Sequence, residues 1–415
     1  MSSMPNTEQD TKVASTPGAT TTLSTSPPET DAPQPSDNPP ALDSSSSSTS
    51  SHTSSSNDEL NQFVSEEDDS VGSPAPPMDV LLPDLIMERA RKMNCFFLNR
   101  HRLDSCKPFI IEDFQVGLIT PEVMRELQGF PDVFVCTDTS VQLHPTLNDY
   151  KTRSNAMEQV LNQLRKHDVF ITLRGWRDEC YEVRVDISEP SLMRMERAAT
   201  CLFGIRQFGV DINGYVHHPE LGLSLWMQRR SQSKPRWGGK LDNVVGGGLS
   251  VGFTVEETAH KEAMEEAGIP EYILKNLQPV GNVMIFFESE RGLSPNTEFV
   301  YDLEFPPDFV PENQDGEVES FHLVPIKDVL PIVLSDEFKT TSLPVVLDFL
   351  VRHGVIDTDS DPELRLLSEL LHIPLGYFYR RASLGAGPGV PPPPLLPPPL
   401  VPCMPPDTDA DPNEK

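Results

Sequence analysis

Between residues 83 and 203, apolar residues recur with the period of a helix in some stretches and with the period of a strand in others. Three stretches place apolar side chains every three or four residues, as on one face of a helix: 83–97, 154–168 and 191–203. Residues 181–187 alternate apolar and polar positions, which is typical of a half-buried strand, and the short apolar run 169–173 predicts another strand. We therefore expect 83–203 to form a smaller α+β domain.

The pattern changes near residue 204 to strands interrupted by glycine. Strands are predicted at 209–218, 222–230, 280–287 and 298–304, with a glycine-dense turn at 246–248 and a final helix at 341–352. We expect a second domain over 204–380. Since the connection between the two domains is short, they are expected to pack together.

Both ends of the chain have compositions that disfavour a folded core. Residues 1–80 contain 13 acidic residues and one lysine, and so contribute −12 to a net charge of −30 for the chain. Segment 1–82 is therefore predicted to be a disordered Ser/Thr/Pro-rich tail. Segment 381–415 is predicted to be a disordered proline-rich tail, and its run at 391–399 is either a passive spacer or a ligand for a proline-binding module.

Several classes of partner and location are disfavoured. The chain is acidic and has no basic stripe, which argues against binding to nucleic acid. No apolar run approaches the ~18 residues that a membrane-spanning helix needs. The first thirty residues lack arginine and an apolar core, so neither a transit nor a secretory peptide is visible, and a cytoplasmic location is predicted.

The segment TVEETAHKEAMEEAGIP, residues 254–270, has strong signals for a helix over 255–267. Thr254 and Glu257 form a capping-box pattern, and Gly268 suits the left-handed residue that ends a helix. Three glutamates with spacing i, i+3 and i+4 share one face: Glu262, Glu265 and Glu266. Such a face is either a solvated acidic surface or an oxygen-rich site for Mg²⁺ or Mn²⁺.

A longer motif favours the metal site. Residues 246–269, GGGLSVGFTVEETAHKEAMEEAGI, resemble the Nudix box, G-x5-E-x7-R-E-U-x-E-E-x-G-U, where U is apolar. Gly247 takes the place of the first glycine, and the three glutamates take the places of the catalytic ones. Two positions depart from the motif, because Phe253 replaces a glutamate and Lys261 replaces an arginine. We expect Lys261 to pair instead with Glu257.

The resemblance extends over about 85–380 and is greatest to one branch of the Nudix family. Segments 175–183, 202–218, 229–249 and 313–326 are similar to the Nudix half of fungal thiamine pyrophosphokinases and to related plant Nudix hydrolases. This resemblance implies an α/β/α sandwich around a mixed sheet, preceded by the smaller domain. It also implies that Glu262, Glu265 and Glu266 bind Mg²⁺ or Mn²⁺, with a backbone carbonyl near Gly246 as a further ligand.

Two further groups of residues are candidates for the site. Positive charge is concentrated in an otherwise acidic chain between 229 and 243, and the candidate substrate-binding residues there are Arg229, Arg230, Lys234, Trp237, Lys240 and Asp242. One of the three glutamates, or an acid after the motif, could deprotonate the attacking water, and Glu298, Glu317 and Glu319 are equal candidates for the later acid.

The resemblance implies a Mg²⁺-dependent pyrophosphohydrolase that converts thiamine diphosphate, or its damaged oxo and oxy forms, to the monophosphate. Hydrolysis of oxidised guanine nucleoside diphosphates, or of other nucleoside diphosphate derivatives, is the alternative enzymatic activity. A non-catalytic Nudix module that binds a ligand belongs to a different class of function, and the complete set of three glutamates argues against it.

Overall fold

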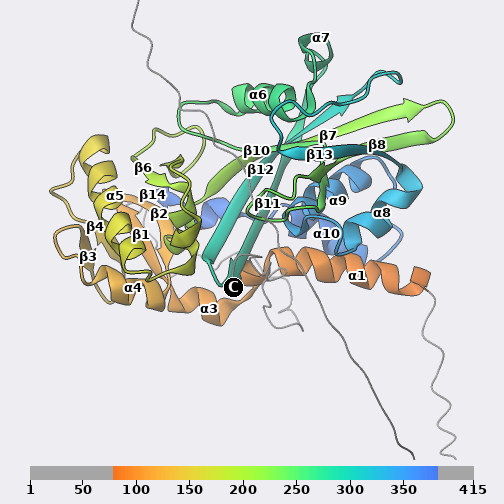
Figure 1. Ribbon diagram of the computed structural model, residues 1–415. Coiled ribbons are helices and arrows are strands. Elements are labelled where there is room, and N and C mark those ends of the chain that lie inside the picture. Colours follow the sequence, from red (N-terminus) through yellow and green to blue (C-terminus); the bar gives the residue numbers. More distant parts are fainter. Residues whose placement is uncertain (1–77, 382–415) are drawn as a thin grey trace, which may run out of the picture. The chain divides into compact units, whose positions relative to one another are not determined.

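The computed structural model describes residues 78–381 and contains one large and one small β-sheet (Figure 1). The strands of the large sheet are β7 (Gln207–His218), β8 (Gly222–Arg230), β9 (Leu241–Asn243), β10 (Val245–Gly248), β11 (Gln278–Ser289), β12 (Gly292–Glu304) and β13 (Val318–Pro325). Those of the small sheet are β1 (Lys107–Ile111), β2 (Phe114–Ile119), β3 (Phe134–Cys136), β4 (Val141–Leu143) and β14 (Arg380–Arg381). A separate hairpin consists of β5 (Cys180–Val183) and β6 (Met193–Glu196).

Helices cover both faces of the large sheet, and shorter helical segments connect the strands of both sheets. The α-helices are α1 (Met78–Met93), α2 (Cys95–Leu98), α3 (Arg100–Ser105), α4 (Pro121–Leu127), α5 (Tyr150–Lys166), α6 (Val255–Ala267), α7 (Glu271–Leu274), α8 (Ile326–Leu334), α9 (Leu343–Arg352) and α10 (Leu367–Leu371). The 3₁₀ helices are η1 (Ile171–Gly175), η2 (Arg197–Leu202), η3 (Thr340–Ser342), η4 (Leu364–Leu366) and η5 (Leu375–Phe378). Within 78–381, no helix is both long and apolar enough to cross a membrane.

The large sheet is mixed and opens in its middle. Its order is β11-β12-β7-β8-β13, with β7 parallel to β12 and antiparallel to β8. Beyond their paired ends β7 and β8 separate, and the chain that follows β8 supplies β9, which pairs with β8, and β10, which pairs with β7. This opening places the free edge of β10 opposite β8.

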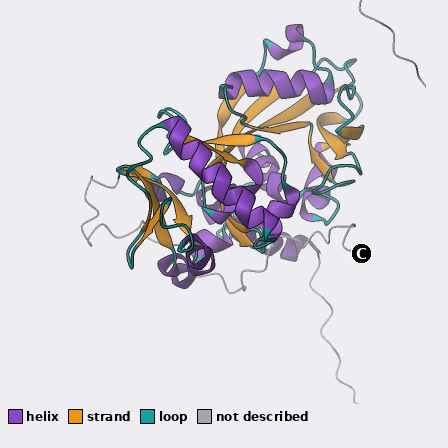
Figure 2. Ribbon diagram, turned by 60° about the vertical axis from the view of Figure 1, so that its left-hand side comes forward, coloured by secondary structure: helices purple, strands orange, loops and turns teal. Residues whose placement is uncertain are grey.

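Helix α6 lies along one face of this sheet, and α8, α9 and α10 lie on the other (Figures 1 and 2). The small stripe Ala259, Ala263 and Ala267 is fully buried against Val210 and Ile212 of β7, because alanine lets the helix approach the strands closely. The predicted α/β/α sandwich with a mixed sheet is therefore confirmed.

A helix near the start of the described chain packs on the large sheet, and the last strand joins the small sheet. Phe96 of α2 packs against Phe286 of β11, with ring centroids 4.6 Å apart, in the core that also holds α9. At the other end, β14 pairs with β2 in the small sheet. The boundary that we place between 203 and 204 stays a prediction, and the tail segments before 78 and after 381 lie outside the described residues.

Three predictions of secondary structure are wrong. Residues 169–173 fall largely in η1 and not in a strand, because the chain turns back at Asp168, where φ is +52°. The predicted helix 191–203 is strand β6 followed by η2, since Met193 and Met195 are buried with the two-residue period of a strand. The glycine run 246–248 is strand β10, not a turn.

Candidate active site

Helix α6 begins and ends where the sequence predicts. The Thr254 hydroxyl accepts a hydrogen bond from the Glu257 amide, and the Glu257 carboxylate accepts one from the Thr254 amide at 2.8 Å. Gly268 ends the helix with φ of 59°, in the left-handed region that favours glycine. These caps fix the rotation of the helix, and they thereby fix the direction in which the three glutamates point.

Glu266 is the most deeply buried of the three glutamates, with 2% of its surface exposed. Its Oε2 atom accepts hydrogen bonds from the Gly246 amide at 3.0 Å and from Gln228 Nε2 at 3.3 Å. It therefore sits in the opening of the sheet, between the free edge of β10 and β8. Burial disfavours the carboxylate and raises the pKa of Glu266 to about 8.

Glu262 lies against the middle glycine of β10. A Cβ atom on Gly247 would be 2.5 Å from Glu262 Cδ and 2.9 Å from its Oε1, so only glycine leaves room for this side chain. Burial also raises the pKa of Glu262 above its ordinary value. The close approach of strand and helix thus places a second carboxylate next to the one at Gly246.

Lys261 neutralises part of this acidic face. Its Nζ atom lies 3.2 Å from Glu262 Oε1 and 2.6 Å from Glu265 Oε2. The expected pair between Lys261 and Glu257 is wrong, because the Glu257 carboxylate is held by Thr254 at the start of the helix. Lys261 thus spans two of the proposed metal ligands.

The free edge of β10 presents backbone groups to the same place. In an antiparallel ladder the N–H and C=O of one residue point to the same side. The Leu249 amide bonds to Phe208 of β7, whereas the Gly246 amide bonds to Glu266 on the opposite side. The Gly246 carbonyl consequently faces the opening in the sheet, where the predicted carbonyl ligand is required.

The donor set is suitable for a hard divalent cation. Carboxylate and carbonyl oxygens are the ligands that Mg²⁺ and Mn²⁺ prefer, and a cation would compensate the burial of Glu262 and Glu266. Within residues 78–381, however, no three acidic, histidine or cysteine side chains are gathered closely enough to hold a metal ion. A metal site here requires the side chains of Glu262 and Glu265 to turn away from Lys261.

Comparisons with known proteins show the family to which the chain belongs. A NUDIX domain model matches residues 212–346, and a model for a domain of unknown function, DUF4743, matches residues 85–207. Nudix hydrolase 24, chloroplastic, of Arabidopsis thaliana is 36% identical over 266 residues, which is 63% of this chain and 72% of that protein. The chain belongs to the Nudix hydrolase family.

Two further relatives have similar coverage. Nudix hydrolase 20, chloroplastic, of Arabidopsis thaliana is 36% identical over 289 residues, or 67% of this chain and 76% of that protein. The protein YJR142W of Saccharomyces cerevisiae is 31% identical over 276 residues, or 62% of this chain and 80% of that protein. The match therefore includes the segment before the Nudix domain as well as the domain itself.

The three downstream acids lie in different surroundings in this Nudix hydrolase. Glu319 is exposed on β13. Glu298 of β12 is partly buried beside Gly209, and burial raises its pKa. Glu317 forms an ion pair with Lys234, and its charge acts on Glu262. Of the three acids, Glu317 is thus the one that pairs with a cation of the predicted substrate-binding segment.

The predicted substrate-binding segment is held in place by ionic and backbone contacts. Arg230 and Lys339 each lie 2.9 Å from the fully buried carboxylate of Asp242. Burial alone would raise the pKa of Asp242, but these two cations lower it below its ordinary value. Arg229 donates to the Gly239 carbonyl at 2.6 Å. Asp242 and Arg229 thus have clear structural contacts.

Trp237 is the unusual residue of this segment. Its φ is +52°, a strained backbone conformation for a bulky residue, and its buried Nε1 has no hydrogen-bond partner. The Nε atom of Arg230 is also buried without a partner. Lys240 lies in the same loop and is the last residue before β9. The strained backbone and the unpaired buried donors set this loop apart from the rest of the segment.

Two polar residues near the site were not identified from the sequence. Gln228 holds Glu266 across the opening of the sheet. Asp211 of β7 is 5% exposed, accepts a hydrogen bond from Asn243, and lies 2.8 Å from the position that a Cβ on Gly246 would occupy. An acid in the middle of a buried strand, as in GVDING, is the signal that could have identified Asp211.

Proposed function

We propose that this Nudix hydrolase uses Mg²⁺ or Mn²⁺ to hydrolyse the diphosphate of thiamine diphosphate or of its oxo and oxy forms, giving the monophosphate. The observation that supports the reaction is the convergence of Glu262 and Glu266 with the Gly246 carbonyl at the free edge of β10. The sequence resemblance of segment 229–249 to the thiamine-related branch of the family supports the substrate class.

Each residue of the site would have a separate role in the reaction. Glu262, Glu265 and Glu266, with the Gly246 carbonyl, would hold the cation, which when bound neutralises phosphate charge and lowers the pKa of water. Gln228 and the Gly246 amide orient Glu266. Glu317, which forms an ion pair with Lys234, would accept a proton from the attacking water.

The surroundings of Trp237 favour an uncharged ring in the substrate. The guanidinium of Arg236 lies 4.0 Å from the centroid of the Trp237 ring, and Lys339 Nζ lies 5.9 Å from it. A thiazolium cation near this ring would meet two positive charges, whereas the oxo form, which has lost its charge, would not. We therefore expect the damaged forms to be hydrolysed with higher kcat/KM than intact thiamine diphosphate.

A phosphate-release screen with Mg²⁺ tests the proposal. The substrates are thiamine diphosphate, its oxo and oxy forms, and nucleoside diphosphates that include the 8-oxo-guanine type. We expect the oxo and oxy diphosphates to be the best substrates, and Trp237→Ala to narrow their advantage. A clear preference for oxidised guanine nucleotides would instead support the alternative activity.

Glu266→Gln tests the assignment of the metal site on the same substrates. The substitution keeps the shape of the side chain but removes its charge, so turnover should fall by orders of magnitude. Glu256→Gln is the matched control, since Glu256 is exposed in the first turn of the same helix. Turnover like that of the wild type in Glu266→Gln at saturating Mg²⁺ would exclude the proposed site.

The cytoplasmic location stays a prediction. The two Arabidopsis relatives carry the word chloroplastic in their names. Fractionation of cells that express the full chain would determine where this protein resides.

A further inference from the structure

We propose that Tyr181 and Arg197, which precede the Nudix domain in the chain, complete the active site as a binding subsite for one phosphate of the substrate. The inference rests on the proposed hydrolysis of a diphosphate. It assigns a role in the reaction to the hairpin β5–β6 and to the start of η2, which lie in the segment matched by DUF4743.

Both side chains contact the last glycine of β10. A Cβ atom on Gly248 would be 3.0 Å from Tyr181 Cζ and 3.2 Å from Arg197 Nη2, and closer still to the tyrosine hydroxyl. Gly248 directly follows Gly247, which lies against Glu262. Consecutive Cα atoms are ~3.8 Å apart, and successive residues of a strand face opposite sides of the sheet. The hairpin therefore reaches β10 from the face opposite the glutamate helix, and a ligand at the free edge of β10 would lie between the two.

A fixed scaffold orients the guanidinium of Arg197. Its Nη1 donates to both oxygens of Glu179, at 2.9 and 3.1 Å, and Ser250 donates to the same carboxylate at 3.0 Å. The guanidinium also lies 4.9 Å from the centroid of the Tyr181 ring. Glu179 and Tyr181 therefore hold Arg197 rigidly, as recognition of a phosphate by arginine requires.

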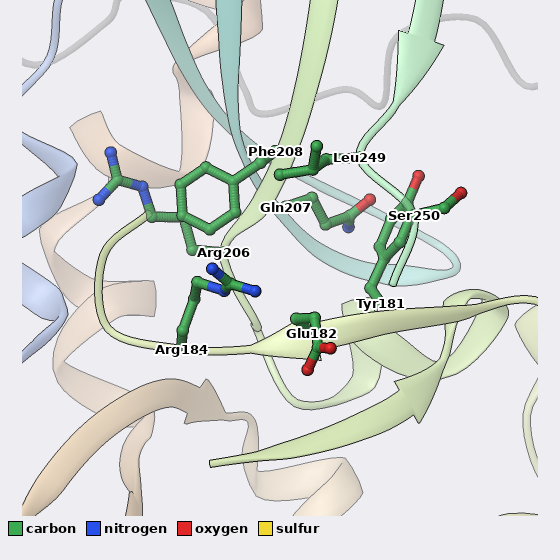
Figure 3. A pocket seen from close by; sticks show the side chains of 8 residues that line it. All are labelled: Tyr181, Glu182, Arg184, Arg206, Gln207, Phe208, Leu249 and Ser250. Carbon is green, nitrogen blue, oxygen red and sulfur yellow. The ribbon is translucent and has the colours of Figure 1, made fainter. Parts of the chain in front are cut away.

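Donors remain available at this position. Among the described residues, neither Arg197 Nη2 nor the Tyr181 hydroxyl has a hydrogen-bond partner, and 31% of the Arg197 side chain is exposed. A small pocket beside Tyr181, lined also by Glu182, Arg184 and Arg206, lies between β5, the start of β7 and the residues after β10 (Figure 3). The donors that a phosphate would use here are therefore Arg197 Nη2 and the Tyr181 hydroxyl.

The backbone of β10 supplies one more donor on the catalytic side. Amides of a strand alternate in direction, so the Gly248 amide points to the same free edge as the Gly246 amide, which binds Glu266. An anion at this edge would meet the Gly248 amide, Arg197 Nη2 and the Tyr181 hydroxyl together. The next phosphate of a diphosphate would then lie toward Gly246 and the carboxylates of the triad.

Nearby acidic groups offset the burial of Arg197. Burial opposes the charge on its guanidinium, whereas Tyr181, Glu179 and, to a smaller extent, Glu262 favour this charge and raise the pKa of Arg197. A phosphate that bridges this guanidinium and a cation on the triad would have charge neutralised at both ends.

Binding of methylenediphosphonate, a diphosphate analogue that cannot be hydrolysed, tests the subsite by calorimetry on the full chain with Mg²⁺. Arg197→Met removes the charge but keeps the length of the side chain, and it should weaken binding about tenfold or more. Tyr181→Phe removes one hydroxyl and should weaken binding about threefold. The matched control is Arg194→Met, on the exposed side of β6, which should bind as the wild type does.

The outcomes separate this inference from the proposed function. If the wild type neither binds the analogue nor hydrolyses any diphosphate, the proposed function fails. If the wild type binds and hydrolyses, but folded Arg197→Met and Tyr181→Phe bind as tightly as it does, the subsite alone is overturned. Should Arg197→Met fail to fold, Tyr181→Phe decides the matter, since the loss of a hydroxyl without a partner leaves the packing intact.

Discussion

Replacement of Gly247 by alanine should damage catalysis far more than stability. The new Cβ would lie 2.5 Å from Glu262 Cδ and closer still to its Cγ, whereas an ordinary van der Waals contact begins near 3.4 Å. The Glu262 side chain must therefore move by about 1 Å or more from Cγ outward. Because a rotation about its Cα–Cβ bond carries Cγ and the carboxyl away from β10 together, the displacement should cost the fold about 1 kcal/mol, at the low end of overpacking substitutions.

The catalytic cost follows from the displacement. A misplacement of ~1 Å in a catalytic group lowers rates by about 10²-fold, which corresponds to roughly 2.7 kcal/mol of activation free energy. We expect kcat on the best substrate of the screen to fall by about this factor, while the melting temperature falls by about 3 °C. Phosphate release and a thermal melt on the same preparations measure the two effects.

Gly376→Ala is the matched control, because the position of its Cβ meets no atom within 4 Å and its backbone conformation is open to alanine. It should change neither rate nor melting temperature. Unchanged kcat in Gly247→Ala would show that Glu262 need not hold its position against β10 and would refute the reasoning. A fall in melting temperature of ten degrees or more would show that the contact is mainly structural.

Three further predictions concern stability and the acidic face. Asn94→Leu should lower the free energy of unfolding by about 3 kcal/mol, because the buried Asn94 side chain donates a hydrogen bond to a carbonyl of α10 and accepts one from an amide of β11. Urea unfolding measures this loss, and Asn155→Ala, at an exposed position, is the control. The hydrogen bond to Asp348 raises the pKa of His372 in the folded protein above its ordinary value of 6.5. Protonated His372 therefore stabilises the fold fully at pH values below 6.5, and this stabilisation is lost as the pH rises through the folded-state pKa. The stability difference between wild type and His372→Gln should thus be larger at about pH 5 than at about pH 9, and equal differences would contradict it. Lys261→Met should tighten the binding of Mn²⁺, because the ammonium group no longer competes with the cation for Glu262 and Glu265. Electron paramagnetic resonance measures this binding, and weaker binding would show that the lysine assists the site.

Local signals were sufficient to predict α6 and the shared face of its glutamates. Its caps and its apolar stripe lie within the helix and its flanking residues, and both ends of the helix agree with the prediction. By contrast, the apolar positions of 191–203 fit the helical period only because the segment is short. Its first part is a strand because Met193 and Met195 pair with β5. Such pairing depends on residues distant in the sequence.

The partners of the site could not be predicted for the same reason. Gln228 reaches α6, and Arg197 reaches β10, from elements that are distant in the chain. The expected partner of Lys261 also shows the limit of local reasoning. Glu257 is at the correct helical spacing, but the capping box, which the sequence also predicts, already occupies its carboxylate.

The glycine run at 246–248 shows how one composition can have two physical causes. Consecutive glycines suggest a turn, because glycine tolerates positive φ, yet none of these three has a positive φ. They lie in a strand, where a glycine marks the close approach of other groups. Gly246 leaves room for Asp211, Gly247 for Glu262, and Gly248 for Tyr181. Each of these side chains comes from a different element, so a larger residue at any position of the run would displace one of the three. The close approach of other elements, and not the path of the backbone, therefore explains the glycines.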